Sequence, residues 1–337
     1  MAESLQHTKQ RIRSVTSVSQ ITKAMELVSA TKMRRSQEIA LSSRPYAFAA
    51  LELLANLAKA VGSSTRSTGS TSSPQANSGQ AAIPSLLERR AVKHTAVVVV
   101  TSDKGLAGSF NSTTLRAFED FLKRESIDPK NDAYRFIAVG QKATQYLLRR
   151  AGRLEEKYIR FGDYTTVEQV KPLVERLVTG YLTHEWDRVI VFSMHFRSAL
   201  RQEVVLREIL PIDFKNIKKA AKEIIPETGR FADLMKESGV KFFEEGKREV
   251  HEEEYLIEPS PEEVLNLLVN HLVLMEIYHL VLEANASEHA ARRAAMKNAS
   301  DNAGELIDDL TLIYNKSRQA AITKELTELT AGAEALK

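Results

Sequence analysis

The chain contains no cysteine and few of the residues that interrupt helices. The absence of Cys among 337 residues excludes disulfides, thiolate metal sites and a cysteine nucleophile, and it is compatible with a reducing compartment. Only 14 Gly and 9 Pro occur, about 4% and 3% of the chain against usual values near 7% and 5%. So few helix breakers over this length favour long helices.

Strong net charge and long apolar runs are also missing. The 47 Lys and Arg against 44 Asp and Glu leave +3, too balanced to indicate nucleic-acid binding from charge alone. The first residues are polar and lack the apolar core of a signal peptide. The most apolar stretch, residues 264–281, is interrupted by Asn, His and Glu and is predicted to be a buried helix. A hydrophobic content of 43% is enough for a core, and the length favours about two domains.

The N-terminal region is predicted to be a long basic helix. Residues 4–60 contain no Gly and a single Pro, Pro45, which is expected to interrupt the helix before a second amphipathic run. Residues 1–45 carry eight Lys or Arg against three Glu, an excess of +5. Apolar residues at three- and four-residue spacing are predicted to form one stripe that faces a partner helix. They are Ile12, Val15, Val18, Ile21, Met25 and Val28.

Two segments have the composition of inserts. Residues 62–82 contain seven Ser, three Thr and three Gly but no Leu, Ile, Val or aromatic residue. Such a segment cannot bury enough surface to fold, so it is predicted to be a flexible surface insert that a protease cuts first. Residues 215–258 are charged and poorly patterned, and they are predicted to be a second insert.

The middle third alternates short strand-like runs with helical ones. Strands separated by helices predict an open, mostly parallel sheet with helices on both faces, a Rossmann-like α/β/α domain. The expected strands are residues 95–101, 134–139, 188–195 and 202–210, and the expected helices are residues 111–125, a helix ending near 150, and 166–184.

The C-terminal region is predicted to be one very long helix. Ser260, Pro261 and Glu263 have the pattern of a helix start, and no further Pro follows. Two long helices at opposite ends of the chain can pair as an antiparallel coiled coil; the alternative, flat packing on the central domain, needs a wider apolar face. The heptad positions are Ala303, Ile307, Leu310, Tyr314, Ser317 and Ala321, then Ile322, Leu326, Leu329, Ala333 and Leu336.

These patterns together predict an α/β chain of five segments. They are an N-terminal coiled-coil helix (1–60), a flexible insert (61–90), an α/β central domain (91–213), a charged insert (214–258) and a C-terminal coiled-coil helix (259–337).

The motifs do not add up to an active site. The turn at residues 102–109, SDKGLAGS, lacks the spacing of a P-loop and the third glycine of a dinucleotide site, so a tight strand-to-helix turn is expected. His184, Glu185 and Asp187 lack a second His and indicate a surface turn, and His271 and His279 are expected to be packing residues. No catalytic residue, cofactor or metal is predicted. Two hypotheses remain: a mechanical or scaffolding protein, and an α/β nucleotide-binding ATPase with coiled-coil arms, which the missing P-loop disfavours.

Four segments resemble the gamma subunit of F-type ATP synthases. They are residues 11–37, residues 102–111 (SDKGLAGSFN), residues 255–265 (YLIEPSPEEVL) and residues 284–328. The resemblance implies a non-catalytic central stalk whose terminal helices stand inside a ring of alpha and beta subunits. It also implies an α/β domain that binds the epsilon subunit and rests on the membrane-embedded ring of c subunits. The implied location is the cytoplasmic face of a bacterial inner membrane, as a peripheral subunit of a proton-translocating synthase.

The resemblance also implies which residues contact the ring. Because one asymmetric shaft touches each beta subunit differently, its rotation would change the conformation of each catalytic site in turn. The alternative for all of these residues is a solvated helix surface. The lower set, near acidic segments of beta, is Lys23, Met25, Lys32, Arg34 and Arg35; the upper set is Arg318, Gln319 and Thr323.

Overall fold

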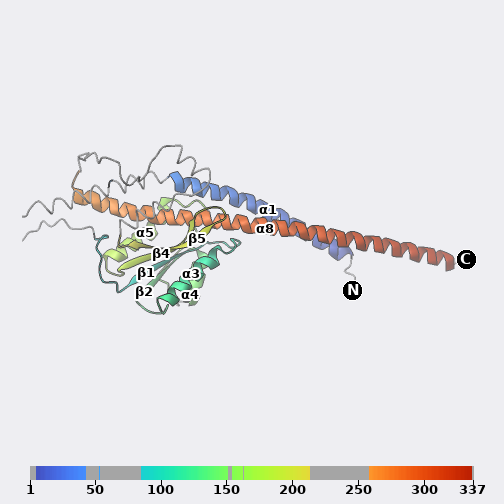
Figure 1. The fold of residues 1–337 in the computed structure, drawn as a ribbon, viewed down its shortest axis with the longest axis horizontal. Coiled ribbons are helices and arrows are strands. Elements are labelled where there is room, and N and C mark those ends of the chain that lie inside the picture. The colour runs from blue at the N-terminus through green and yellow to red at the C-terminus, as the bar shows by residue number, and fades with distance from the viewer. Residues whose placement is uncertain are drawn as a thin grey trace, which may run out of the picture. The chain divides into compact units, whose positions relative to one another are not determined.

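The computed structural model describes two compact units (Figure 1). The helical unit comprises residues 1–31, 106–108 and 289–337, and the sheet unit comprises residues 32–105 and 109–288. The described residues are 5–42, 53, 85–150, 154–161, 163–212 and 258–335. The predicted kink at Pro45, the amphipathic run after it, the insert at 62–82 and the charged residues 215–254 therefore lie outside the described residues.

The sheet unit is built on a five-stranded sheet in the order β3-β2-β1-β4-β5. The first four of these strands are parallel, and β5 pairs with β4 in the antiparallel direction, which confirms the predicted mostly parallel sheet. The three-residue edge strand β3 was not predicted. The strands are β1 (Thr95–Val100), β2 (Tyr134–Val139), β3 (Glu156–Tyr158), β4 (Arg188–Phe196) and β5 (Gln202–Leu210).

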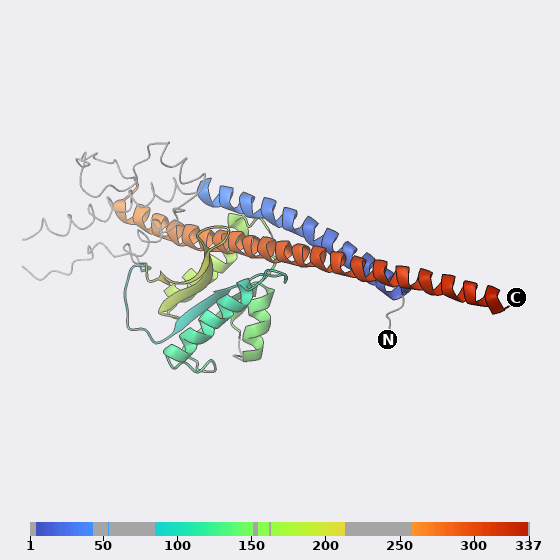
Figure 2. The same ribbon diagram turned by 45° about the vertical axis from the view of Figure 1, so that its right-hand side comes forward.

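One face of the sheet is covered by α3 (Phe110–Arg124) and α4 (Gln141–Arg150), which lie together in Figure 2. Phe118 is the centre of this core, with its ring edge-to-face against Phe136 and Phe192, each at a centroid distance of 5.6 Å. Alternate residues of β1, β2 and β4 complete the cluster, as the two-residue period of a strand requires.

The other face carries α5 (Val167–Leu182) and the first part of α8 (Pro261–Ala335). The backbone N–H of Glu263 donates to Ser260 Oγ at 3.2 Å, which confirms the predicted helix start. Ser193 Oγ on β4 donates to the carbonyl of Leu280 at 3.1 Å, so α8 packs directly on the sheet. Among the described residues only α8 is long and apolar enough to cross a membrane, and half of that apolar window is buried inside the protein.

The helical unit pairs residues 5–31 of α1 (Leu5–Ser42) with α8 beyond residue 288. The two helices run in opposite directions side by side in both ribbon views, as the predicted antiparallel coil requires. The first predicted heptad of α8 is confirmed, because Ala303 and Leu310 are buried and the other four positions are half-buried. The structure thus combines both packing modes: the helix lies flat on the sheet before residue 289 and pairs with α1 after it.

The predicted stripe on α1 is only half correct, because Ile12, Val15 and Met25 are half-buried and the other three members are not. The buried or half-buried positions alternate at three and four residues, whereas Val18, Ile21 and Val28 are exposed. Spacings of mostly three wind around a helix: Ile12 and Val28 are sixteen residues apart and so lie ~160° apart around the axis. The observed seam is Leu5, Thr8, Ile12, Val15, Ser19, Thr22, Glu26 and Ser29.

Candidate partner-binding surfaces

The glycine-containing turn after β1 is structural. The carboxylate of Asp103 accepts the backbone N–H of Gln141 at 3.0 Å and that of Arg160 at 2.8 Å. Ser102 Oγ donates to the carbonyl of Lys104 at 2.6 Å. The polar groups of this turn therefore join the ends of neighbouring elements. This outcome matches the predicted strand-to-helix turn.

The acidic residues near the end of α5 serve ion pairs. Glu185 receives two hydrogen bonds from Arg176, both 2.7 Å long, and these hold the pKa of the Glu185 carboxyl below its ordinary value. Burial would raise the pKa of Asp187, but two backbone N–H groups and Arg90 outweigh burial and lower it. Within the part of the chain that the structure describes, no group of three or more His, Asp or Glu residues could hold a metal ion.

The predicted lower contact residues do not gather in one determined site. Lys23 and Met25 belong to the helical unit, whereas Lys32, Arg34 and Arg35 belong to the sheet unit. Lys23 is exposed, Met25 is half-buried, and Arg34 and Arg35 are exposed.

Three of these cations have carboxylate neighbours. Lys23 Nζ donates to Glu26 at 2.9 Å, and Arg35 donates to Glu38 at 3.3 Å, both within one turn of α1. Lys32 Nζ donates to Asp163 at 2.6 Å, across 131 positions of sequence. Since Lys32 ties α1 to the loop before α5, part of its charge is neutralised inside the sheet unit.

An exposed apolar face on α1 was missed by the sequence reasoning. Val18, Ile21, Leu27 and Val28 are 51–61% exposed, although three of them were assigned to the buried stripe. Val18, Ile21 and Val28 lie within ~80° around the axis of one helix and form a surface suited to a protein partner, whereas Leu27 lies on another side. The signal that could have found it is the alternating three-four spacing of Thr and Ser in the same helix, which marks the true seam.

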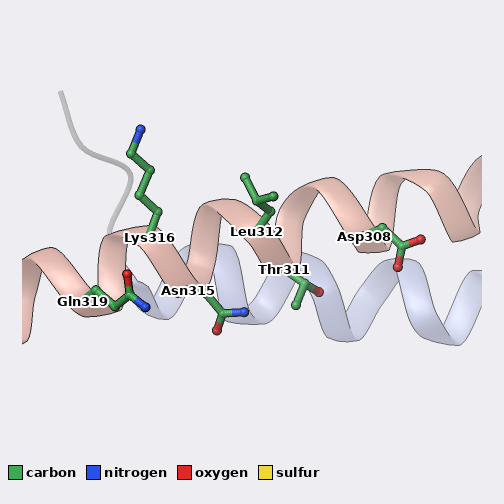
Figure 3. A pocket seen from close by; sticks show the side chains of 6 residues that line it. All are labelled: Asp308, Thr311, Leu312, Asn315, Lys316 and Gln319. Atoms are coloured by element: carbon green, nitrogen blue, oxygen red, sulfur yellow. The ribbon is translucent and has the colours of Figure 1, made fainter.

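The predicted upper contact residues lie on the C-terminal part of α8, in the helical unit. Arg318, Gln319 and Thr323 are all exposed, and Thr323 Oγ1 donates to the carbonyl of Gln319 at 2.9 Å within the helix. Gln319 also borders an open hollow of about 490 Å³ (Figure 3). Its described lining residues all belong to α8: Asp308, Thr311, Leu312, Asn315, Lys316 and Gln319.

No other described element covers the end of α8. Every residue from 322 to 333 is exposed, including Ile322, Leu326 and Leu329 at 48%, 58% and 70%. These are three positions of the second predicted heptad, so that heptad is not covered by described residues. An apolar stripe with heptad spacing on a single helix has the form of a surface that another protein covers.

Comparison with known proteins covers the whole chain. The family model described as ATP synthase matches residues 4–336. The ATP synthase gamma chain of Roseiflexus castenholzii is 36% identical over 334 residues, 99% of this chain and 98% of that relative. The gamma chain of Moorella thermoacetica is 35% identical over 329 residues, 98% of each.

The fold also matches solved structures. A chain of the Tetrahymena thermophila mitochondrial ATP synthase central stalk and c-ring has a TM-score of 0.53 and 23% identity, covering 83% of this chain and 99% of that one. A chain of the Euglena gracilis mitochondrial ATP synthase has a TM-score of 0.58 and 16% identity, covering 98% of this chain and 94% of that one. At these identities the likeness concerns the fold alone.

Proposed function

The chain belongs to the ATP synthase gamma chain family, and from this premise we propose that it is the central stalk of a proton-translocating F-type ATP synthase. The observation that carries the proposal is the identity of 36% over 99% of the chain to a gamma chain of nearly equal length. A gamma chain has no catalytic site of its own. Its role is to couple ion flow through the membrane sector to ATP synthesis by other subunits.

The proposed partners are the alpha and beta subunits of the catalytic ring, the epsilon subunit and the c-subunit ring. The bare apolar end of α8 supports placing that end inside a protein ring, because a stripe of Ile and Leu side chains is stabilised when a partner covers it. One asymmetric shaft touches each beta subunit differently, so turning it shifts the populations of the three catalytic conformations in sequence.

We rank the proposed contact residues by how exposed their side chains are. Lys23, Arg34 and Arg35 are exposed and suited to acidic segments of beta, and Met25 is a half-buried residue of the same helix. Lys32 is proposed to contribute less to the contact with beta, because its ammonium group already donates a hydrogen bond to Asp163. The proposed upper contact consists of Arg318, Gln319 and Thr323, close to the bare end of α8.

The location follows from membership of the complex. A gamma chain is part of the membrane-associated ATP synthase. For this chain we propose the cytoplasmic face of a bacterial inner membrane, with attachment through the c-subunit ring as a peripheral subunit that does not itself span the bilayer.

Co-expression of the tagged chain with the alpha and beta subunits of its organism tests the proposal. We expect the three proteins to co-purify and to hydrolyse ATP, while the purified chain alone hydrolyses none. A second variant tests the apolar stripe: replacing Ile322, Leu326 and Leu329 with Gln keeps the helix but removes the apolar side chains. This variant should co-purify more weakly than the parent. ATP hydrolysis by the chain alone would support the nucleotide-binding alternative, and failure to co-purify would overturn the stalk.

A further inference from the structure

A buried polar pair joins α8 to the sheet. His195 Nδ1 on β4 lies 2.7 Å from Glu283 Oε2 on α8, and the two side chains are only 3% and 7% exposed. Two residues earlier on the same strand, Ser193 donates to the carbonyl of Leu280 on the preceding turn of the helix. Successive inward-facing residues of β4 therefore hold successive turns of α8.

Other charged groups surround the pair. Arg207 on β5 is buried and acts electrostatically on both Glu276 and Glu283, which lie two turns apart on the same side of α8. His279 is buried on that side as well. Burial alone would raise the pKa of Glu283, but the hydrogen bond from His195, assisted by Arg207 and His279, lowers it. Glu283 is thus a buried carboxylate that other elements hold in its charged form.

Stability alone does not account for such a pair. Well-packed apolar residues often replace a buried ion pair with no loss of stability, because desolvation of two charges offsets their attraction. The best-attested benefit of a buried polar contact is a unique register. Besides these polar groups, the buried residues of α8 before residue 289 are mostly apolar, and apolar packing has no direction, so it does not distinguish one turn of helix from the next. They include Leu272, Val273, Ile277, Leu280 and Ala284.

We propose that His195 and Glu283 are positioning residues that fix the register of α8 along β4. A shift of the helix by one turn, about 5.4 Å, would separate the imidazole from the carboxylate and bury each without its partner. The mechanical consequence, transfer of torque between the sheet and α8 without slipping, rests on the proposed stalk function. The register itself is a property of the sheet unit alone.

The absence of cysteine makes the register directly measurable. Ser193→Cys is combined with one further Cys at residue 277, 280, 284 or 287, positions that follow the buried side of α8. Disulfide yield along this series reports which turn of the helix faces Ser193. Each yield is compared, at the same pair of positions, between the parent chain and a variant with His195→Met and Glu283→Met.

We expect the parent to cross-link at one or two adjacent positions and the methionine variant to spread its yield to positions one turn away. Single substitutions, Glu283→Met or His195→Met, should lower the thermal midpoint much more than the double one, because each leaves a buried polar partner uncompensated. The matched control, Arg176→Met with Glu185→Met, removes an ion pair of the same unit that contains no residue of α8 and should leave the cross-linking profile unchanged.

An unchanged profile in the methionine variant would overturn the proposal. The proposal would also be overturned if two double variants both failed to fold: His195→Met with Glu283→Met, and His195→Leu with Glu283→Leu. That result would mean that the two residues supply stability rather than register. Neither outcome bears on the stalk function, because the isolated chain is used without other subunits.

Discussion

The interiors of the two units are built from different residues. The core of the sheet unit contains four buried phenylalanines, Phe118 and three around it, together with Val97 and Val99 of β1. The α1 seam of the helical unit instead buries Thr8, Thr22 and Ser29. Each phenylalanine removes far more apolar surface from water than a Thr or Ser. The sheet unit is therefore expected to be stable by itself, whereas the coil is expected to depend on added partners.

Truncation in the phenylalanine core should have the largest effect. Phe118→Ala removes three edge-to-face ring contacts, with Phe136, Phe192 and Tyr146, and leaves a cavity. We expect a loss of about 3–5 kcal/mol in the free energy of unfolding, measured by urea titration. The control Leu148→Ala, at an exposed side chain of the same unit, should change it by less than about 0.5 kcal/mol. A small effect of Phe118→Ala would contradict the contrast between the two interiors.

The sheet unit should also show a pH dependence that comes from Glu276. Glu276 is half-buried, and this burial raises its pKa to about 7 against the opposing influence of Arg207; its partial contact with solvent reduces the effect on stability. The folded state then binds the proton more tightly than the unfolded state, so stability falls as pH rises from about 4.5 to above 7. Glu283, whose pKa is lowered, stays ionised over this range.

Glu276→Gln tests this dependence. The amide does not titrate, so the variant should gain about 1–3 kcal/mol relative to the parent between pH 5 and 8, measured by urea titration at several pH values. A parent and a variant with parallel pH profiles would show that Glu276 reaches solvent in the folded protein.

A substitution in the polar seam of α1 should have a smaller effect on stability, and it should stabilise the protein rather than destabilise it. The hydroxyl of buried Thr22 donates to the carbonyls of Val18 and Ser19 within its own helix. Thr22→Val keeps the shape and replaces this hydroxyl with a methyl group in the seam. We expect a stabilisation of the helical unit of about 0.5–1 kcal/mol, seen as a higher thermal midpoint of helicity. Thr31→Val, at an exposed position of α1, is the control and should have no effect. A lower midpoint for Thr22→Val would mean that the seam requires the hydroxyl.

The same contrast explains how far the sequence could predict the fold. The β-branched run at residues 95–100 and the cap at Ser260 are local signals, and both are found where they were expected. The seam of α1 was misassigned because its buried members are Thr and Ser while Val18 and Ile21 face outward. In this helix several apolar residues are exposed while Thr and Ser are buried, so hydrophobicity alone could not identify the buried positions.

Contacts between residues far apart in the sequence could not be predicted from local patterns, for a physical reason. Strand β3 has only three residues, two of them charged, and it exists because β2 offers a free edge to pair with. The ion pair between Lys32 and Asp163 joins groups 131 positions apart, and so does not follow from any local pattern. His195 and Glu283, separated by 88 positions, are a third case. Each depends on the assembled sheet unit rather than on its own segment.

The basic residues near the end of α1 should give the smallest effect on stability and a selective effect on coupling. Lys32→Ala, Arg34→Ala and Arg35→Ala together keep the helix, because Ala has the best helix propensity. Loss of the pair between Lys32 and Asp163 should cost no more than about 1 kcal/mol, since both side chains are partly exposed. In the assembled complex we expect ATP hydrolysis to be largely retained and ATP-driven proton pumping to fall, because the shaft would hold each beta conformation less firmly.

Comparing subsets of these substitutions identifies which charges act outward. Arg34 and Arg35 are exposed, whereas Lys32 is already held by Asp163, so the double variant of the two arginines should account for most of the loss of pumping. Raised ionic strength should reproduce part of that loss in the parent, because it screens exposed pairs. Asp163→Asn, which releases Lys32, serves as the matched control and should leave pumping unchanged or raise it. Equal loss of hydrolysis and pumping would indicate failed assembly, and retention of both would mean that these three basic residues are only solvated.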